Sequence, residues 1–142
     1  MFLPDANVLI HALREGSPEH EPCRRWLTAT ASAGEAIFLC ELVEVALLRI
    51  PTLPRLRLVP MPEVLGFWQD DLWGYPGIRR ITAGHRHGAI FSNYVTALDL
   101  CGNDVNDAWL AALAVEHRAT LVTTDSGFGR FPRLSWMSLL PS

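Results

Sequence analysis

The sequence contains no lysine, and all 12 of its basic residues are arginine. This absence excludes mechanisms that need a catalytic or phosphate-binding lysine, among them those of P-loop NTPases and protein kinases. Acidic residues are in excess, and the formal net charge is −3 at pH 7. The chain as a whole therefore lacks the positive charge that marks many nucleic-acid-binding proteins.

Cysteine is scarce as well. Cys23, Cys40 and Cys101 are far apart, and the sequence has no CxxC pair. Widely spaced cysteines in odd number argue against a disulfide framework or a zinc site built on paired cysteines. We therefore expect buried, reduced thiols and a cytoplasmic protein.

Long apolar runs are also missing. The most apolar stretch, residues 36–50, contains two glutamates and is too short to span a bilayer. The first residues, MFLPD, include no basic region, so we expect neither a signal peptide nor a membrane partner. Because 49% of the 142 residues are hydrophobic and no linker interrupts them, we predict a single globular domain over residues 1–142.

Short apolar runs alternate with segments of helical periodicity along the chain. Predicted strands cover residues 2–4, 36–40, 78–81 and 121–124, with possible edge segments at 55–59 and 133–137. Predicted helices cover residues 6–13, 18–30, 41–49, 62–73, 82–98 and 104–115. This alternation predicts an α/β fold with a mainly parallel sheet flanked by helices.

Four acidic residues fall where a predicted strand ends or a predicted helix begins. They are Asp5, Glu41, Asp107 and Asp125. Taken singly, an acid at such a position is more readily a helix cap or a turn residue than a catalytic group. The carboxyl ends of parallel strands, however, meet at one edge of a sheet beside helix N-termini, where ligands bind in open α/β folds. We therefore expect these four carboxylates to share one crevice.

Four carboxylates in one crevice repel one another unless a cation lies between them. The set has no histidine or cysteine, so zinc is a poor match, whereas oxygen ligands suit Mg²⁺ or Mn²⁺. Such an ion lowers the pKa of a bound water and neutralises charge on a phosphate. The residues alone thus favour metal-dependent hydrolysis of a phosphoester.

Three segments resemble the motifs of PIN-domain ribonucleases, in particular the VapC-type toxins of bacterial toxin–antitoxin pairs. These segments are residues 5–10 (DANVLI), 103–114 (NDVNDAWLAALA) and 121–128 (LVTTDSGF), and residues 131–136 are similar to the family's ending. The resemblance spans almost the whole chain. It implies a PIN-like three-layer sandwich and a metal-dependent endoribonuclease that acts as a toxin.

By this resemblance, Asp5 and Asp107 would bind Mg²⁺ directly, with Mn²⁺ as a possible substitute, and Asp125 would complete the metal pocket. Many relatives carry another acid at the position of Ala46, where this chain has none. Others carry a glutamate directly after the second strand, so Glu41 is predicted as the fourth carboxylate, with Glu44 as the second choice.

The family also implies partners. They are an RNA substrate, a cognate antitoxin of the VapB type that blocks the site, and a second copy of the chain in a homodimer. Arginines that are close in sequence, such as Arg79, Arg80 and Arg86, provide local positive charge for RNA phosphates, although surface arginines with no ligand would give the same pattern.

Other classes fit less well. Signalling receiver domains resemble this pattern in their acids but need a lysine, and haloacid-dehalogenase phosphatases need a second aspartate where this chain has Asn7. A degenerate PIN domain that binds protein or RNA without catalysis remains the alternative, because Ala46 replaces an acid. The residues do not specify which RNA would be cleaved.

Overall fold

The structure is a computed structural model that describes residues 1–141. In chain order its elements are β1 (Phe2–Pro4), α1 (Ala6–Leu13), α2 (His20–Ser32), β2 (Ile37–Leu39), α3 (Glu41–Arg49), α4 (Met61–Gly66), the π-helix η1 (Phe67–Leu72), β3 (Ile78–Arg80), α5 (His87–Ala97), α6 (Asp104–Glu116), β4 (Thr120–Thr123), the 3₁₀-helix η2 (Ser126–Arg130) and β5 (Trp136–Ser138). Helices and strands alternate, which confirms the predicted α/β class.

The strands form one parallel sheet in the order β3-β2-β1-β4-β5. The central strand, β1, and its neighbour β4 come from opposite ends of the sequence and pair Phe2 with Thr120 and Pro4 with Val122. The direction of strand order reverses between them, and a crevice forms outside the carboxyl ends of parallel strands at such a point. The topology therefore predicts where a ligand would bind.

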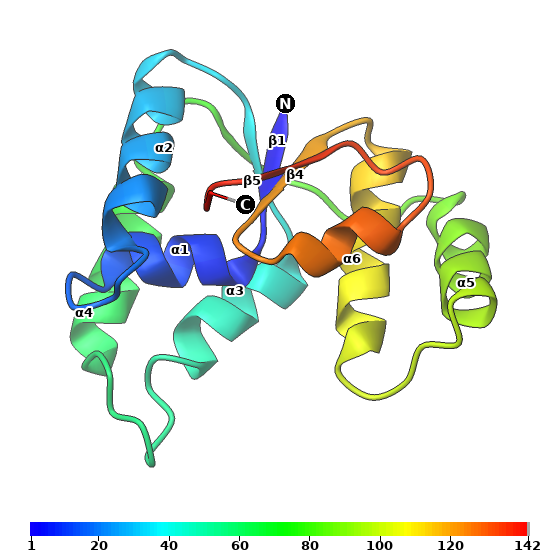
Figure 1. Ribbon diagram of the computed structural model, residues 1–142. Helices are drawn as coiled ribbons and strands as arrows, with labels where there is room; N and C mark the ends of the chain where they lie inside the picture. Colours follow the sequence, from blue (N-terminus) through cyan, green and yellow to red (C-terminus); the bar gives the residue numbers. More distant parts are fainter. Residues whose placement is uncertain (142) are drawn as a thin grey trace.

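Helices cover both faces of the sheet. In Figure 1, α1 and α2 lie to the left of the strands, whereas α5 and α6 lie to the right. The core between these layers contains side chains with no exposed surface, such as Leu3 and Leu121 from the sheet and Leu9 and Leu27 from the helices. This arrangement confirms the expected three-layer sandwich.

Several boundaries differ from the sequence-based expectation. Residues 55–59 form part of a turn and an irregular loop, not an edge strand, and Arg57 has a φ of +43° that no strand accommodates. The helix expected from residue 82 begins at His87, because the Glu116 carboxylate accepts hydrogen bonds from the backbone N–H groups of Gly84, Arg86 and His87. These bonds satisfy the free N–H groups at the start of α5.

The prediction of buried cysteines is correct for Cys23 and Cys40 and wrong for Cys101, which is exposed in the turn before α6. Within residues 1–141, no helix has both the length and the apolar character needed to cross a bilayer.

Candidate active site

Three of the four predicted acids line one pocket, at the carboxyl ends of β1 and β4. Asp5, Asp107 and Asp125 meet there from segments far apart in the sequence, and Asp104 joins them from the first turn of α6. The pocket has a volume of about 350 Å³. Arg49 of α3 also lines it, so that the acids and one arginine share a single cavity.

Asp5 is the most buried of these acids, with only 6% of its surface exposed. It follows β1 directly and caps α1, because its Oδ1 accepts a hydrogen bond from the backbone N–H of Asn7 at 2.6 Å. Its Oδ2 accepts a second bond from Thr123 Oγ1, also at 2.6 Å. Burial raises the pKa of Asp5, and the bonds from Thr123 and Asn7 only partly offset this effect.

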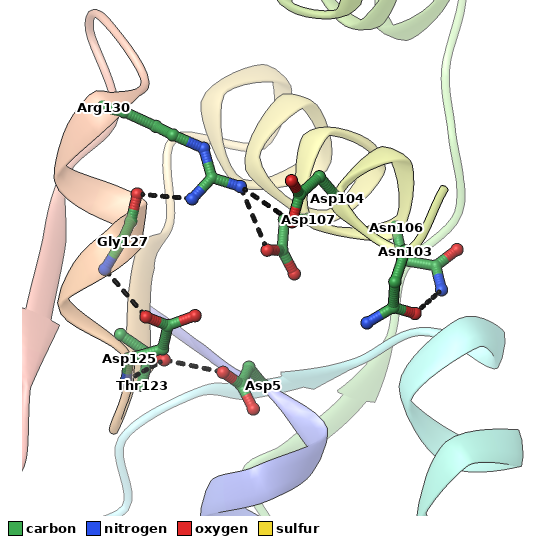
Figure 2. A network of polar contacts seen from close by, with 9 residues as sticks. All are labelled: Asp5, Asn103, Asp104, Asn106, Asp107, Thr123, Asp125, Gly127 and Arg130. Atoms are coloured by element: carbon green, nitrogen blue, oxygen red, sulfur yellow. Dashed lines mark hydrogen bonds and ion pairs between the residues drawn. The ribbon is translucent and has the colours of Figure 1, made fainter. Parts of the chain in front are cut away.

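Thr123 links β4 to the residue that follows β1 at the pocket. Its fully buried hydroxyl donates to Asp5 and accepts a bond from the backbone N–H of Asp125 at 2.9 Å. The Asp125 side chain in turn accepts from the N–H of Gly127 at 2.8 Å, which fixes it at the start of η2. Figure 2 shows this chain of bonds along the floor of the pocket, opposite the start of α6.

On the opposite wall, Asp107 forms an ion pair with Arg130. The distance from Arg130 Nη2 to Asp107 Oδ2 is 3.2 Å, and the same nitrogen lies 3.7 Å from Asp104 Oδ1. Burial raises the pKa of Asp107, the Arg130 guanidinium lowers it, and the negative charges of Asp125 and Asp5 raise it further. The neighbouring acids therefore repel one another across this pocket.

The fourth predicted acid lies elsewhere. Glu41 lines an adjacent, largely apolar pocket between α3, α5 and α6, which shares Leu42, Val45 and Asn106 with the aspartate pocket. Its strand, β2, lies on the far side of β1 from β4. The structure therefore does not bring Glu41 into the aspartate pocket, and its role as fourth carboxylate stays a prediction.

Glu44, the second choice for that role, has both carboxylate oxygens engaged in hydrogen bonds to other side chains. Its carboxylate accepts bonds from Arg80 at 2.9 and 2.7 Å, from the Trp68 indole at 2.8 Å and from the Trp73 indole at 3.3 Å. The side chain is 5% exposed and does not line the aspartate pocket. Glu44 therefore braces α3 against η1 and β3.

Sequence reasoning missed three residues of the site. As an acid in the first turn of a predicted helix, Asp104 has an ordinary structural explanation, but its position one turn before Asp107 places both on one face of α6. Thr123 shows no signal beyond its place two residues before Asp125. Nothing in the sequence signals that Arg130 pairs with Asp107, because this contact depends on how η2 folds back over the pocket.

The chemistry of the donor set fits a hard divalent cation. The side chains at the pocket that could bind a metal are carboxylates and the amides of Asn7, Asn103 and Asn106, which supply oxygen and no sulfur or imidazole. As placed, no three acidic, histidine or cysteine side chains of residues 1–141 are close enough together to share an ion. Burial is the main cause of the raised pKa values of Asp5 and Asp107, and the charges of neighbouring acids add to it. Both effects disfavour the ionised carboxylates, and a bound cation would offset them.

Comparisons with known proteins agree with this geometry. A family model described as PIN domain matches residues 2–134. Ribonuclease VapC37 of Mycobacterium tuberculosis is 36% identical over 137 residues, which cover 96% of this chain and 95% of that protein. Ribonuclease VapC43 of the same species is 36% identical over 138 residues, which cover 96% of this chain and 93% of that protein.

Solved structures share the fold. VapBC2 from Rickettsia felis, crystallised with a DNA fragment from its promoter, aligns with a TM-score of 0.73 at 18% identity over 96% of this chain and 97% of that one. FitAcB from Neisseria gonorrhoeae aligns with a TM-score of 0.69 at 20% identity over 98% of both chains. At 18% and 20% identity, this similarity shows that the chains share a backbone fold.

Proposed function

The chain belongs to the PIN-domain family, and on this premise we propose that it is a metal-dependent endoribonuclease that hydrolyses RNA phosphodiester bonds as the toxin of a type II toxin–antitoxin pair. One observation carries the proposal. Three aspartates, contributed by the ends of β1 and β4 and by the start of α6, line a single pocket at the reversal point of the sheet. The names of the ribonuclease relatives, at 36% identity over nearly the full length, support RNA as the substrate.

In this proposal Asp5 and Asp107 hold a Mg²⁺ ion, or Mn²⁺ in its place, and Asp125 completes the pocket. When bound, the ion supplies an activated water and neutralises charge on the scissile phosphate. The chain's own contribution is to orient the ligands: Thr123 and the N–H of Asn7 fix both oxygens of Asp5. Such fixed orientation is what tunes a metal site.

Arg49 provides a contact for the RNA backbone. It lines the same pocket, from α3, and its guanidinium forms no ion pair with any of residues 1–141. A guanidinium binds phosphate through two parallel N–H groups, so an arginine beside the carboxylates would hold the phosphate that is cleaved. The net charge of −3 disfavours RNA binding by the protein as a whole, and Arg49 provides positive charge at the pocket itself.

Two residues compete for the place of a fourth carboxylate. Asp104 lines the aspartate pocket, whereas Glu41, the residue favoured by resemblance, lines the neighbouring one. Replacing the true ligand is expected to weaken Mn²⁺ binding about tenfold or more, by analogy with the loss seen on removing groups that support a metal site. Titrations of Asp104→Asn and Glu41→Gln with Mn²⁺ distinguish the two.

The partners follow from the same relatives. The name VapBC2 joins VapB with VapC, which supports a VapB-type antitoxin as the partner of this chain. The cytoplasm is proposed as the location because the widely spaced cysteines suit a reducing compartment. A homodimer is proposed by family resemblance alone.

Cleavage of purified structured RNAs tests the function. We would compare the wild type, Asp107→Asn and the control Asp71→Asn, an exposed acid of η1 outside the pocket, each with Mg²⁺, Mn²⁺ or EDTA. We expect cleavage by the wild type and the control only when metal is present, and none by Asp107→Asn. Undiminished cleavage by Asp107→Asn would refute the metal assignment. Folded wild type that binds RNA and never cleaves it would favour the binding-module alternative.

A further inference from the structure

Arg130 lies where the proposed function needs a free carboxylate. Its Nη2 contacts Asp107 Oδ2 at 3.2 Å and Asp104 Oδ1 at 3.7 Å, while its Nη1 donates to the carbonyl of Gly127 at 3.0 Å. Figure 2 shows the guanidinium reaching from η2 across the pocket to the start of α6. A cation of the chain itself therefore neutralises two of the acids.

The ion pair between Arg130 and Asp107 has a longer contact distance than a structural ion pair in the same protein. Arg80 binds Glu44 through two bonds of 2.9 and 2.7 Å, in the range of charge-assisted hydrogen bonds. The contacts of Arg130 to the two aspartates are longer, at 3.2 and 3.7 Å, and of these two only the contact to Asp107 is a hydrogen bond. Arg130 Nε is moreover buried without a hydrogen-bond partner among residues 1–141. An unpaired buried donor is unfavourable, so this geometry is poorly optimised as a permanent brace.

The guanidinium and a metal ion would compete for the same oxygens. Asp107 is a proposed metal ligand, and its Oδ2 already faces Arg130. A divalent ion beside a guanidinium also suffers repulsion between like charges. If Arg130 left Asp107, it could keep two contacts within its own segment. These are its hydrogen bond to the Gly127 carbonyl and its position 4.9 Å from the Phe131 ring.

We propose that Arg130 is a built-in counter-cation of the pocket, which neutralises Asp107 and Asp104 in the metal-free protein and withdraws from Asp107 when a divalent cation binds. This inference rests on the proposed metal-dependent function and adds a self-inhibiting contact to it. In the metal-free chain the contact limits repulsion among the acids, and it lowers metal affinity by the free energy needed to break it. If Arg130 instead positioned Asp107 for the metal, its replacement would weaken metal binding and not strengthen it.

The test is the affinity for Mn²⁺ alone, measured by isothermal titration calorimetry. The pair is partly exposed and its loss frees Asp107, so we expect Arg130→Gln to bind Mn²⁺ about three- to tenfold more tightly than the wild type. Arg130→Lys keeps the charge and loses the planar fork, and it should fall between them. The control Arg133→Gln removes the same charge from an exposed site three residues away and should stay within about twofold of the wild type, since exposed charges are well screened.

A second measurement follows the side chain itself. The Nε–H resonance of Arg130, assigned by its loss in Arg130→Gln, should shift on titration of the wild type with diamagnetic Mg²⁺, because the guanidinium leaves Asp107. Unchanged or weaker Mn²⁺ binding by Arg130→Gln, with normal binding by the wild type, would overturn the counter-cation and leave the proposed function standing. Wild type that binds no Mn²⁺ at all would overturn both.

Discussion

The hydroxyl of Thr123 offers the sharpest test of how the fold builds the site. Thr123→Val keeps the shape of the side chain and removes one oxygen, which donates to Asp5 and accepts from the N–H of Asp125 at distances of 2.6 and 2.9 Å. Because Thr123 is fully buried, water cannot replace either bond. Losing a bond to a carboxylate costs about 1.5–3 kcal/mol and leaving a backbone N–H unpaired about 1 kcal/mol, so we expect a loss of roughly 2–4 kcal/mol in the free energy of unfolding.

The effect should depend on pH in a defined direction. The Thr123 bond lowers the pKa of Asp5, whereas burial raises it above the ordinary 3.8. Removing the hydroxyl raises that pKa further. A carboxyl with a raised pKa in the folded state has its full stability below the unfolded pKa and loses it as the pH rises through the folded pKa. The deficit of Thr123→Val should therefore be smallest below pH 3.8 and larger at neutral pH.

Urea unfolding of the metal-free protein in EDTA, at acidic and neutral pH, measures this difference. The matched control is Thr120→Val on the same strand, whose hydroxyl makes only a 3.3 Å contact to Ser135 near the surface. The control should change the free energy of unfolding by less than about 0.5 kcal/mol. Equal losses from the two variants, or a loss that shrinks as the pH rises, would refute the role given to Thr123.

Three further outcomes follow from the contacts of single acids. Burial and neighbouring acids raise the pKa of Asp107, so its own contribution to the stability of the metal-free protein is full below pH 3.8 and falls as the pH rises through that pKa. In urea unfolding, the free energy of unfolding of Asp107→Asn relative to that of the wild type should therefore increase across this pH range. Glu44→Gln breaks the charged bonds to Arg80 and should cost about 2–3 kcal/mol in the same assay, against less than about 0.5 kcal/mol for Glu21→Gln, whose contact to Arg25 is exposed and 3.9 Å long. Saturating Mn²⁺ should raise the melting temperature of the wild type and not that of Asp107→Asn, as scanning calorimetry would show.

Much of the fold was predictable because its signals are local. Strand β4 and helix α6 each carry one clear periodicity, and Asp5 and Asp125 follow strands directly, so their place at one edge of the sheet could be inferred. The start of α5 was not predictable, since it depends on the Glu116 carboxylate about 30 residues away in sequence. Contacts between distant segments leave no mark on local periodicity.

The same distinction explains the site. The aspartates could be assigned from their positions at strand and helix ends, but the partner of each could not. Arg130 meets Asp107 only because η2 folds over the pocket, and Thr123 meets Asp5 only because β4 pairs with β1 in one register. A shift of that register by one residue would turn the Thr123 hydroxyl to the other face of the sheet.

Strand order also accounts for the place of Glu41. Neighbouring strands lie about 4.8 Å apart, so a residue that follows β2 is displaced by roughly 10 Å across the sheet from one that follows β4. Asp5, after the strand between them, is within reach of either side. A cation shared by Asp5, Asp107 and Asp125 would thus lie toward β4, where Asp104 of α6 already faces the pocket. Glu41 would reach it only if the start of α3 moved toward α6, so weaker Mn²⁺ binding by Glu41→Gln would indicate that the ion draws these two helices together.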